Sequence, residues 1–542
     1  MASKKPVQMA EASAQTICGV GDFYRGRSIF ITGGSGLMGK VLVEKLLRSC
    51  PELDHIYILM RSKRGKSPET RMEEMFKLPL FERVRKERPG SEAKVSAISG
   101  DINPPEGEGG ANGLGIAEDE ERTLLANTSV VFHCAATLRL EAKLKDAIDT
   151  NTAGTWRILQ LCRRMPKLVA FIHLSTAFCH VDHELLEEKT YPTPVDPDEI
   201  IRCVKWMDDA MLDAITPRLL HPHPNTYTFS KRLAETLVEH ERKHMPVAIV
   251  RPSIVTPVWQ EPVPGWVDNL NGPVGLMVGA GKGVIRSMHC KGEYHAEVIP
   301  VDMAINAMIA SAWKVAINKN KDIPVYNLAQ AGLKPITWTE VLNIARKHIN
   351  EYPFEGVVWY PDGNMRSTRL AHNICVIFLH FLPAYFIDFI MLLCRQKRFM
   401  VRIQRRIQDG LEVLQYFTTR EWKFDNQNFV SLAKSLSVED QNKFYMDYAP
   451  LDEEEYLKTT LLGARQYCMK EDLSTLPSAR RHMRRMYWVD KAFSVLFYGL
   501  LLWFILSWFN TAKELLDAGG SVVNSSLQNI PIVRAVFQGQ EV

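Results

Sequence analysis

The stretch Arg27-Ser28-Ile29-Phe30-Ile31-Thr32-Gly33-Gly34-Ser35-Gly36-Leu37-Met38-Gly39-Lys40 decides the fold. A β-branched and aromatic run ends in three spaced glycines, and apolar residues then recur with helical spacing. Strand, glycine turn and helix together bring backbone N–H groups and a helix N-terminus to a pyrophosphate. A glycine-rich turn without a ligand is the alternative, and the partners that follow along the chain argue against it. The sequence therefore predicts a dinucleotide site with contacts from Thr32, Gly33, Ser35, Gly36, Leu37, Met38 and Gly39.

Length and composition describe a large globular protein. A chain of 542 residues predicts roughly two to four domains, and 46% apolar residues supply an ample core. The net charge of +4 is small, and the basic residues cluster near two apolar runs, which favours a membrane surface over nucleic acid. The ten cysteines show neither a CxxC pair nor a metal-like spacing, so we interpret them as reduced thiols.

Apolar runs that follow the glycine turn indicate further strands, with helical sequence between them. They are residues 56–60, 95–102, 130–136, 168–174 and 247–253. A chain that alternates strands with helices forms a parallel sheet with right-handed crossovers. The sequence therefore predicts an α/β fold with a Rossmann-type, doubly wound parallel sheet. Further cofactor contacts are expected where these strands end, from Asp101, Ile102, Ala135, Ala136, Thr137, Pro252 and Ser253.

Basic residues stand where the second strand ends. In this fold that position meets the adenine ribose, and an acidic residue there accepts a hydrogen bond from the 2′-hydroxyl of NAD. Here Arg61 follows the strand directly, and Lys63, Arg64 and Lys66 come next without an acid. A basic cluster suits a 2′-phosphate, so we expect NADPH, with Arg61 and Lys66 as contacts. A solvated basic loop is the alternative interpretation.

A tyrosine and a lysine four residues apart open a later helix. Tyr227 and Lys231 share one face of that helix. Such pairs are common on exposed helices. Here, however, the pair follows a nucleotide turn and five strands, the fifth of which ends at Ser175 and Thr176. These four residues are therefore candidates for proton transfer beside a bound cofactor.

The order of these motifs resembles extended short-chain dehydrogenase/reductases. It runs Thr-Gly-x-x-Gly-x-x-Gly, Gly-Asp-Ile, Ala-Ala, Asn-x-x-Gly-Thr, Ser-Thr, Tyr-x-x-x-Lys and Arg-Pro. More narrowly, the chain resembles the alcohol-forming fatty acyl-CoA reductases of animals from about residue 22 to residue 509. The stretches that carry this likeness are residues 173–178, 206–209, 264–269, 279–283 and 301–302. Phe178 stands where that family more often has tyrosine, and no catalytic consequence is expected.

The resemblance implies NADPH-dependent reduction of a long-chain fatty acyl-CoA to a primary alcohol. Two hydride transfers would pass through a hemithioacetal and an aldehyde, with release of CoA. Tyr227 would be the acid and Thr176 the second donor to the substrate oxygen. Ser175 would point to the opposite face if the strand is regular, whereas a bend would exchange the two. Lys231 would hold the nicotinamide ribose and lower the pKa of the phenol. Asn151 would anchor a proton-relay water.

Two other functions remain as alternatives. One is a membrane-anchored dehydrogenase or epimerase of the same fold, acting on a sterol or a sugar nucleotide. The other is an NADPH-binding scaffold without catalysis, against which the intact Tyr227–Lys231 pair argues. None of these functions needs a cysteine nucleophile, and we interpret Cys134 and Cys179 as buried and inert.

Beyond residue 350 the sequence turns helical and apolar. The run 374–393 could span a bilayer by length, but His380, Pro383 and Asp388 make spanning costly. A basic stretch follows at residues 395–406. We interpret this region as hydrophobic helices at a membrane surface or around an acyl tunnel, with the cations facing anionic headgroups. A buried helical hairpin is the alternative.

A second apolar run, residues 492–509, carries no charge and is just long enough to span. The arginines within residues 480–485 precede it, which puts its N-terminal side and the catalytic body in the cytosol. We therefore expect a single-pass protein of the endoplasmic reticulum or the peroxisome. Asn524 begins an N-glycosylation pattern beyond the span, and Asn127 begins another in the cytosolic body.

The predicted organisation has five parts: a tail (1–24), a reductase domain with a substrate-binding part (25–350), a helical domain (351–475), a transmembrane helix (492–509) and a second tail (510–542). Residues 204–212 indicate an inserted amphipathic helix, either a surface insertion or part of an acyl-binding wall. The expected partners are a long-chain acyl-CoA and a lipid bilayer, without nucleic acid or metal.

Overall fold

A seven-stranded parallel sheet organises the N-terminal half of the computed structural model, which describes residues 19–318 and 322–528. The strand order is β3-β2-β1-β4-β5-β7-β11. The order reverses between β1 and β4, which is the switch point where ligands bind in doubly wound sheets. The strands are β1 Ser28–Thr32, β2 Ile56–Met60, β3 Val95–Ser99, β4 Thr128–His133, β5 Ala170–Leu174, β7 Val247–Pro252 and β11 Val325–Leu328.

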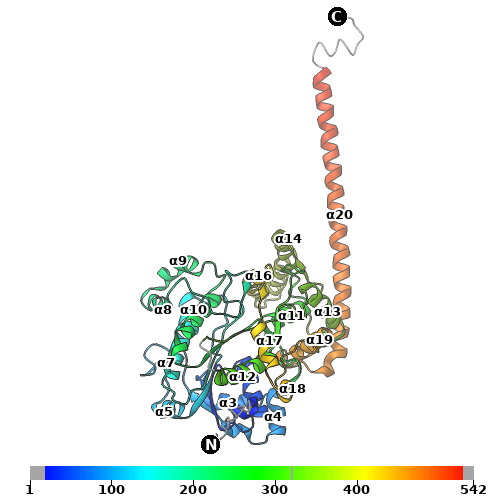
Figure 1. Cartoon of the computed structure of the whole chain (residues 1–542). Helices are drawn as coiled ribbons and strands as arrows, with labels where there is room; N and C mark the ends of the chain where they lie inside the picture. Colours follow the sequence, from blue (N-terminus) through cyan, green and yellow to red (C-terminus); the bar gives the residue numbers. More distant parts are fainter. Residues whose placement is uncertain (1–18, 319–321, 529–542) are drawn as a thin grey trace, which may run out of the picture.

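Helices cover both faces of this sheet, as Figure 1 shows. Their bounds are α1 Val20–Phe23, α2 Leu37–Ser49, α3 Pro68–Phe76, α4 Glu82–Glu87, α5 Glu118–Asn127, α6 Leu144–Ala147, α7 Gly154–Cys162, α8 Pro197–Trp206, α9 Asp209–Leu220, α10 Thr226–His240 and α12 Val301–Ile317. Successive side chains of a strand point to opposite faces. Ile29 and Ile31 therefore pack in one core with α2 and α12, whereas Phe30 packs in the other with α7 and α10.

The predicted Rossmann-type sheet is confirmed, with shorter strands than expected. The predicted third and fourth strands continued to residues 102 and 136, but β3 ends at Ser99 and β4 at His133, and both segments leave the sheet as loops. The four-residue strand β11 was not predicted. It extends the sheet by pairing with β7.

The N-terminal boundary is a correction to the predicted tail. Residues 1–18 lie outside the described part of the chain, but α1 is ordered, and Val20 and Tyr24 are fully buried. The Tyr24 hydroxyl donates a hydrogen bond of 2.9 Å to the Ile309 carbonyl of α12. Aromatic and aliphatic burial therefore ties residues 19–24 to the core.

The predicted single helix at 204–212 is also wrong, because two helices meet there. Helix α8 ends at Trp206, and α9 begins at Asp209. The Asp208 carboxylate accepts a hydrogen bond of 2.8 Å from the Met211 backbone N–H, so it caps α9. An N-cap residue starts a new helix, which explains the break.

The C-terminal half is built from helices and short paired strands. The helices are α11 Pro273–Gly281, α13 Trp338–Glu351, α14 Arg369–Cys375, α15 Leu382–Leu393, α16 Met400–Thr418, α17 Gln427–Lys434, α18 Val438–Lys443, α19 Glu453–Gly463 and α20 Leu476–Gln528. The strand pairs are β8 (Ile254–Thr256) with β10 (Val298–Pro300), β9 (Ser287–His289) with β12 (Asn364–Arg366), and β6 (Leu185–Leu186) with β13 (Lys423–Phe424). Phe429 and Phe444 join the sheet core, so residues 351–475 do not pack independently of the sheet.

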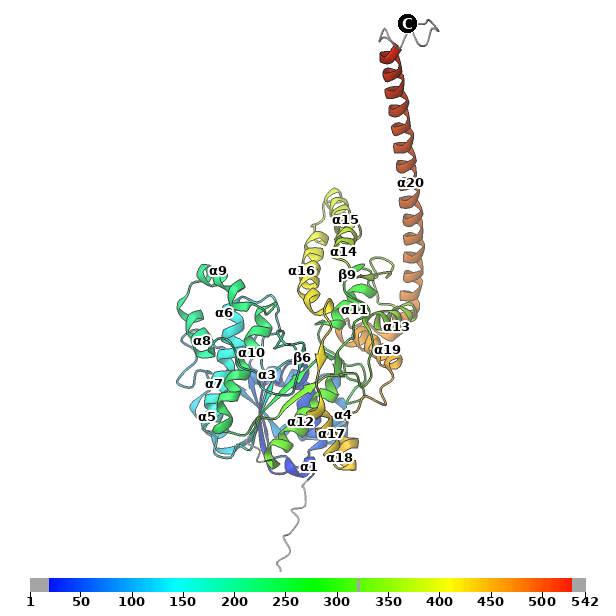
Figure 2. The same ribbon diagram turned by 45° about the horizontal axis from the view of Figure 1, so that its top comes forward.

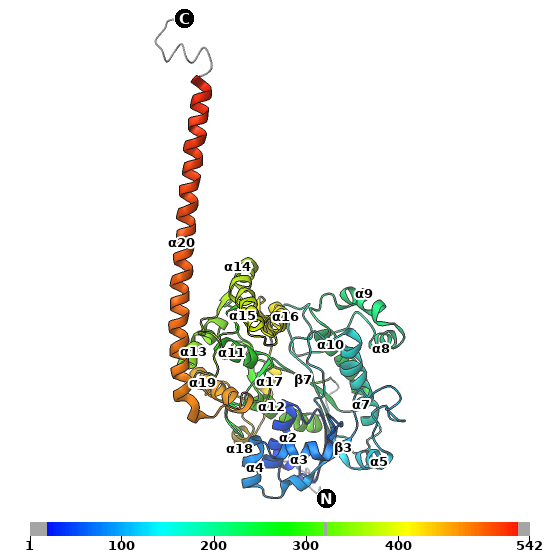
Figure 3. The same cartoon turned by 180° about the vertical axis from the view of Figure 1, so that it is seen from behind.

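Two helices are long and apolar enough to cross a membrane by length and composition, Arg369–Leu393 and Leu473–Thr511. Figures 1 and 2 show α20 leaving the body as a single rod, on the side toward which α14 and α15 point. The predicted span 492–509 lies within α20. The predicted tail continues as helix to Gln528, and residues 529–542 lie outside the described part of the chain. Figure 3 shows the same arrangement from behind.

Candidate active site

Helix α10 brings Tyr227 and Lys231 to the carboxyl end of β5. Asn225 caps this helix, because its side chain accepts a hydrogen bond of 3.0 Å from the Thr228 backbone N–H. The Lys231 ammonium donates to the carbonyl of Leu174, the last residue of β5, at 2.7 Å. The lysine therefore joins the helix to the strand end that carries the next two candidates.

Ser175 and Thr176 point to different partners beyond that strand end. The Thr176 hydroxyl makes a hydrogen bond with the Tyr227 phenol. The Ser175 hydroxyl instead lies 3.8 Å from the Cys179 sulfur. Both residues are buried. Of the two predicted donors, Thr176 is thus the one paired with the candidate acid.

Desolvation shifts the pKa values of both Tyr227 and Lys231. Desolvation raises the pKa of Tyr227 above its usual value, and the hydrogen bond with Thr176 offsets part of that rise. Desolvation lowers the pKa of Lys231 to about 8. We expected Lys231 to lower the pKa of the phenol, but here its ammonium is directed to Leu174. The phenol therefore holds its proton at neutral pH before the reaction, and a neighbouring cation is needed to help release it.

Asn151 lies in η3 (Ile148–Ala153), a turn of π-helix that continues into α7. Its amide nitrogen donates to the Ser230 hydroxyl at 2.9 Å and to the Thr137 carbonyl at 3.2 Å. Its side-chain oxygen accepts from the Thr137 backbone N–H at 2.8 Å. Asn151 therefore fixes the loop after β4 against α10, and its suggested water-binding role remains a prediction.

The glycine turn has the shape that a pyrophosphate requires. Gly33 has φ +73°, and a Cβ there would lie 2.7 Å from the Ala135 nitrogen. A Cβ on Gly39 would lie 2.3 Å from the Gly33 carbonyl oxygen, because α2 packs tightly on the turn. Gly36 caps α2 without a side-chain hydrogen bond. The N-terminus of α2, which begins at Leu37 and Met38, is thus free of a side-chain cap that would compete with a phosphate.

The strand end after β4 borders this turn, and the end of β7 lies further along the same edge of the sheet. The Thr32 hydroxyl accepts from the Ala135 N–H at 3.2 Å, which holds residues 135–137 beside the glycines. At the end of β7 the Pro252 carbonyl accepts from the Ala177 N–H at 2.9 Å. The buried Ser253 hydroxyl has no partner among the described residues. An unpaired buried hydroxyl at this edge fits a polar ligand such as a dinucleotide.

Beyond the end of β2, a cation that the sequence did not reveal lies beside the glycine turn. Arg61 is 59% exposed and forms a 3.0 Å ion pair with Asp101. Arg71 of α3 donates to the Ser35 hydroxyl at 3.2 Å and also bonds the Arg61 carbonyl. Arg71 comes one turn into a helix that Ser67 caps, and only the packing of that helix directs it to the glycine turn. It was missed for this reason.

Two predicted contacts are engaged elsewhere. The Lys66 ammonium forms an exposed ion pair with Glu74. Ile102 is buried, and its carbonyl accepts from Arg157 at 2.6 Å. The Lys66 ammonium and the Ile102 carbonyl are thus bound to protein groups.

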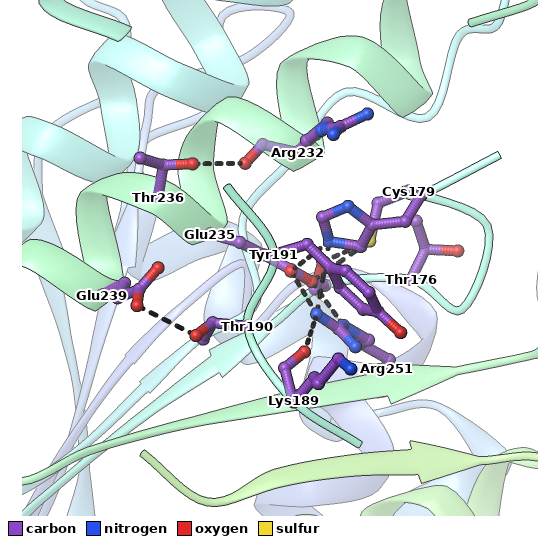
Figure 4. A network of polar contacts seen from close by, with 12 residues as sticks. Thr176, Cys179, Lys189, Thr190, Tyr191, Arg232, Glu235, Thr236, Glu239 and Arg251 are labelled. Atoms are coloured by element: carbon purple, nitrogen blue, oxygen red, sulfur yellow. Dashed lines mark hydrogen bonds and ion pairs between the residues drawn. The ribbon is translucent and has the colours of Figure 1, made fainter. Parts of the chain in front are cut away.

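A buried ionic network lies beside Thr176 and the loop that follows it (Figure 4). Glu235 lies one turn beyond Lys231 on α10, and its carboxylate accepts from Arg251 at 2.7 and 2.8 Å and pairs with His180 at 2.8 Å. Arg251 also donates to the carbonyls of Glu187 and Lys189. The network thus joins β7, α10 and the loop after Thr176. The sequence did not reveal it, because its members are distant along the chain.

The same network contains the one group of described residues whose atoms could share a metal ion, Cys179, His180 and Glu235. The Arg251 guanidinium already neutralises Glu235 there. Desolvation raises the pKa of Cys179 and raises that of Cys134 to about 12. Protonated thiols are poor nucleophiles. Both cysteines therefore lack the thiolate character that catalysis would need.

The fold and this site define a Rossmann-type oxidoreductase. Family models described as male sterility protein match residues 31–308, the NAD-binding part, and residues 379–471, the Sterile part. Fatty acyl-CoA reductase 1 of Xenopus laevis is 38% identical, and the match covers 89% of this chain and 92% of that protein. Fatty acyl-CoA reductase 2 of Mus musculus is 38% identical over the same shares. The chain therefore belongs to the fatty acyl-CoA reductase family, as the motifs predicted.

Solved structures support the fold alone. The terminal R domain of the myxalamid biosynthetic pathway aligns with a TM-score of 0.52 at 18% identity, over 81% of this chain and 90% of that domain. The reductase domain of a nonribosomal peptide synthetase from Mycobacterium tuberculosis also has a TM-score of 0.52, at 16% identity, over 81% and 92%. Both likenesses agree with the Rossmann-type sheet described above.

Proposed function

We propose that this protein reduces a long-chain fatty acyl-CoA to a primary alcohol with NADPH, in two hydride transfers. The observation that carries the proposal is the pairing of the Tyr227 phenol with the Thr176 hydroxyl at the carboxyl edge of the parallel sheet. The names of the relatives supply the substrate class. A carbonyl oxygen at this pair would meet two donors, one of which can release its proton.

The cofactor would lie across the switch point of the sheet. The glycine turn and the N-terminus of α2 would hold the pyrophosphate. Arg61 and Arg71 would hold the 2′-phosphate, which is why we propose NADPH instead of NADH. When bound, the cofactor supplies the hydride. The unpaired hydroxyl of Ser253 and the close packing of Gly33 support this placement.

Tyr227 and Thr176 act on the oxygen that gains negative charge as hydride arrives. Their hydroxyls donate to it, and preset donors of this kind stabilise the transition state. Tyr227 then gives up its proton. Lys231 stabilises the phenolate that remains, because an adjacent cation favours the charged form. Its ammonium would turn from Leu174 towards the nicotinamide ribose and the phenol.

The release of CoA follows from the chemistry of thioesters. After the first reduction the hemithioacetal collapses, and a thiolate leaves easily because thiols ionise near pKa 8.5. The aldehyde can then meet the same two donors, Tyr227 and Thr176. No covalent bond to the protein is needed, in agreement with the protonated Cys134 and Cys179.

Product analysis tests this proposal. Membranes that contain the protein are incubated with NADPH and a panel of acyl-CoAs, and products are separated by gas chromatography. We expect a primary alcohol, free CoA and two NADPH oxidised for each CoA released. Oxidation of a sterol or epimerisation of a sugar nucleotide, with no alcohol from any acyl-CoA, would favour the alternative dehydrogenase function. A single NADPH for each CoA would limit the reaction to the aldehyde.

We propose that α20 anchors this activity in a membrane, with the body in the cytosol. The first turns of α20 contact the body, where the Trp359 indole donates to Asp490 at 2.6 Å and His482 bonds the Val357 carbonyl. Beyond Asp490 the large apolar side chains are exposed. This change from contact to exposure marks where a bilayer would begin.

The glycosylation pattern at Asn524 tests the compartment. In the endoplasmic reticulum the far side of α20 meets the glycosylation machinery, whereas in a peroxisomal membrane it does not. A glycosidase-sensitive mass shift abolished by Asn524→Gln would indicate the reticulum, and its absence would favour the peroxisome. Asn127, at the end of α5 in the body, should never be modified and serves as the internal control. Proteolysis of the far tail in sealed organelles would contradict the spanning arrangement.

A further inference from the structure

An apolar cavity lies in the C-terminal half, between α11, α13 and α19. It contains about 1530 Å³ of empty space, open solvent at its mouth included. Large apolar side chains line it, among them Met277, Met288, Trp338, Leu342 and Leu457. A cavity of this size and lining suits an apolar ligand. None of its wall residues comes from α8 or α9, the region suggested as an acyl-binding wall.

Several of the polar side chains on the cavity wall are bound to protein groups. The Tyr456 hydroxyl lies 2.7 Å from both the Thr256 hydroxyl and the Pro257 carbonyl. The Ser287 hydroxyl shares a hydrogen bond of 2.9 Å with His372. Arg346 donates to the Gly363 carbonyl at 2.6 Å. Because these groups are already satisfied, the cavity can take up hydrocarbon without leaving them unpaired.

The chain segment that follows Pro252 leads from the edge of the sheet to the cavity wall. Thr256 on its wall ends β8, which continues the chain from β7 through Ser253. Pro252 at the end of β7 accepts a hydrogen bond from Ala177, the residue after Thr176. An extended chain rises about 3.3 Å per residue, so the wall at Thr256 lies on the order of 13 Å from Pro252. A long chain whose carbonyl meets Thr176 can therefore reach the cavity.

We infer that this cavity holds the hydrocarbon tail of the acyl substrate and that α11 and α13 set its preferred length. The inference rests on the proposed function, because it needs a substrate whose reacting carbonyl lies at Thr176. Ala280 of α11 and Ala345 of α13 are small residues on the wall. Each leaves room that a longer tail would occupy.

Substitutions that fill or enlarge the cavity test this inference. Ala280→Phe and Ala345→Phe should shift the optimum of kcat/KM to shorter acyl chains, with a loss of about fourfold for each methylene displaced from apolar contact. Met277→Ala and Leu342→Ala should shift it to longer chains. Lys347→Phe is the matched control, because Lys347 lies on α13 outside the wall, exposed and paired with Glu454.

A direct binding measurement separates this inference from the proposed function. The purified full chain is titrated with S-hexadecyl-CoA and S-octyl-CoA, thioethers that cannot be reduced, and with a long fluorescent fatty acid. We expect Ala345→Phe to weaken the hexadecyl compound and the fatty acid at least tenfold and the octyl compound little. Equal binding by wild type and all filling variants overturns the cavity assignment even if acyl-CoA is reduced. If no acyl-CoA is reduced, the proposed function fails. Weaker binding of the fatty acid to Ala345→Phe than to wild type would still show that the cavity binds hydrocarbon.

Discussion

Helices α12 and α15 have similar apolar compositions and opposite surroundings. In α12 nearly every residue is buried against the sheet and α17. In α15 the large apolar residues face outward, with Phe386 63% and Leu382 57% exposed. Soluble proteins rarely expose a continuous apolar face of this kind, so such a face indicates contact with a partner or a membrane. The comparison teaches that apolar sequence builds the core in the sheet half and an exposed apolar surface in the C-terminal half.

Two polar residues in and beside α15 explain why its apolar side chains face outward. His380 accepts from the Arg286 and Ser287 N–H groups at 3.0 and 3.1 Å. The Asp388 carboxylate accepts from the backbone at the start of α16 at 2.9 to 3.1 Å. The residues that made spanning costly thus point into the protein, while the apolar residues point out. This arrangement favours a hairpin of α14, α15 and α16 that dips into one leaflet.

The largest expected effect tests the chemistry of the sheet half. Tyr227→Phe removes the proton donor and leaves the ring in place, so turnover should fall by roughly 10²- to 10⁴-fold. NADPH binding and membrane retention should not change, because neither uses the phenol proton. Steady-state kinetics and flotation on vesicles measure both. Tyr57→Phe on β2 is the matched control, and activity within a few-fold of wild type would remove Tyr227 from the mechanism.

The second prediction separates helices that build the core from helices that contact lipid. A chain ending at Asp490 should lose its carbonate-resistant membrane fraction roughly tenfold or more, because a spanning helix anchors far more strongly than an interfacial face. Its melting temperature in detergent should hardly change. The reciprocal change, Ala307→Asp in α12, buries an unpaired carboxylate and should abolish folding. If the shortened chain failed to fold, α20 would belong to the core as α12 does.

The contrast also shows what the sequence could predict. Strands β1 and β2 were predicted closely, because short apolar runs between turns leave few alternatives. Strand β11 has only four residues and was missed. Arg71 and the Glu235–Arg251 pair were missed because their partners meet only after folding. The cavity could not be predicted, since its wall is assembled from residues between 256 and 460.

Two arginines in the sheet half, Arg61 and Arg71, should bind the 2′-phosphate of NADPH. Arg61→Ala and Arg71→Ala should each weaken NADPH roughly ten- to hundredfold, since a charge-assisted hydrogen bond contributes about 1.5–3 kcal/mol. NADH, which lacks the 2′-phosphate, should be affected little. Fluorescence titration with both cofactors measures the ratio. Lys66→Ala is the control, because Lys66 pairs with Glu74. Equal losses for both cofactors would show that the arginines support the fold of the loop instead.

The cations between α15 and α16 should bind the headgroups of anionic lipids. Arg395, Lys397 and Arg398 are exposed between α15 and α16. Each neutralisation to glutamine should weaken binding of the chain ending at Asp490 to anionic vesicles about fivefold, since one cation near such a surface contributes about 1 kcal/mol. Binding to neutral vesicles should not change. Arg122→Gln, exposed on α5, is the control. A salt-insensitive loss on neutral vesicles would point to misfolding of the hairpin.

The smallest expected effect is the contribution of the buried Lys231 to the pH dependence of the free energy of unfolding. Burial holds the pKa of Lys231 at about 8, below the value of about 10.4 that an unfolded chain gives it. Between these two values the unfolded chain binds more protons, so the free energy of unfolding rises with pH through this window. Relative to Lys231→Met, which has no such proton, wild type should gain about 1 kcal/mol between pH 7 and pH 9. Denaturant titration of the cofactor-free chain in detergent at several pH values measures this gain. Lys243→Met, at an exposed position after α10, is the matched control. A difference that stayed flat, or that fell with pH, would mean that Lys231 keeps its full charge in the fold and that burial does not set its protonation.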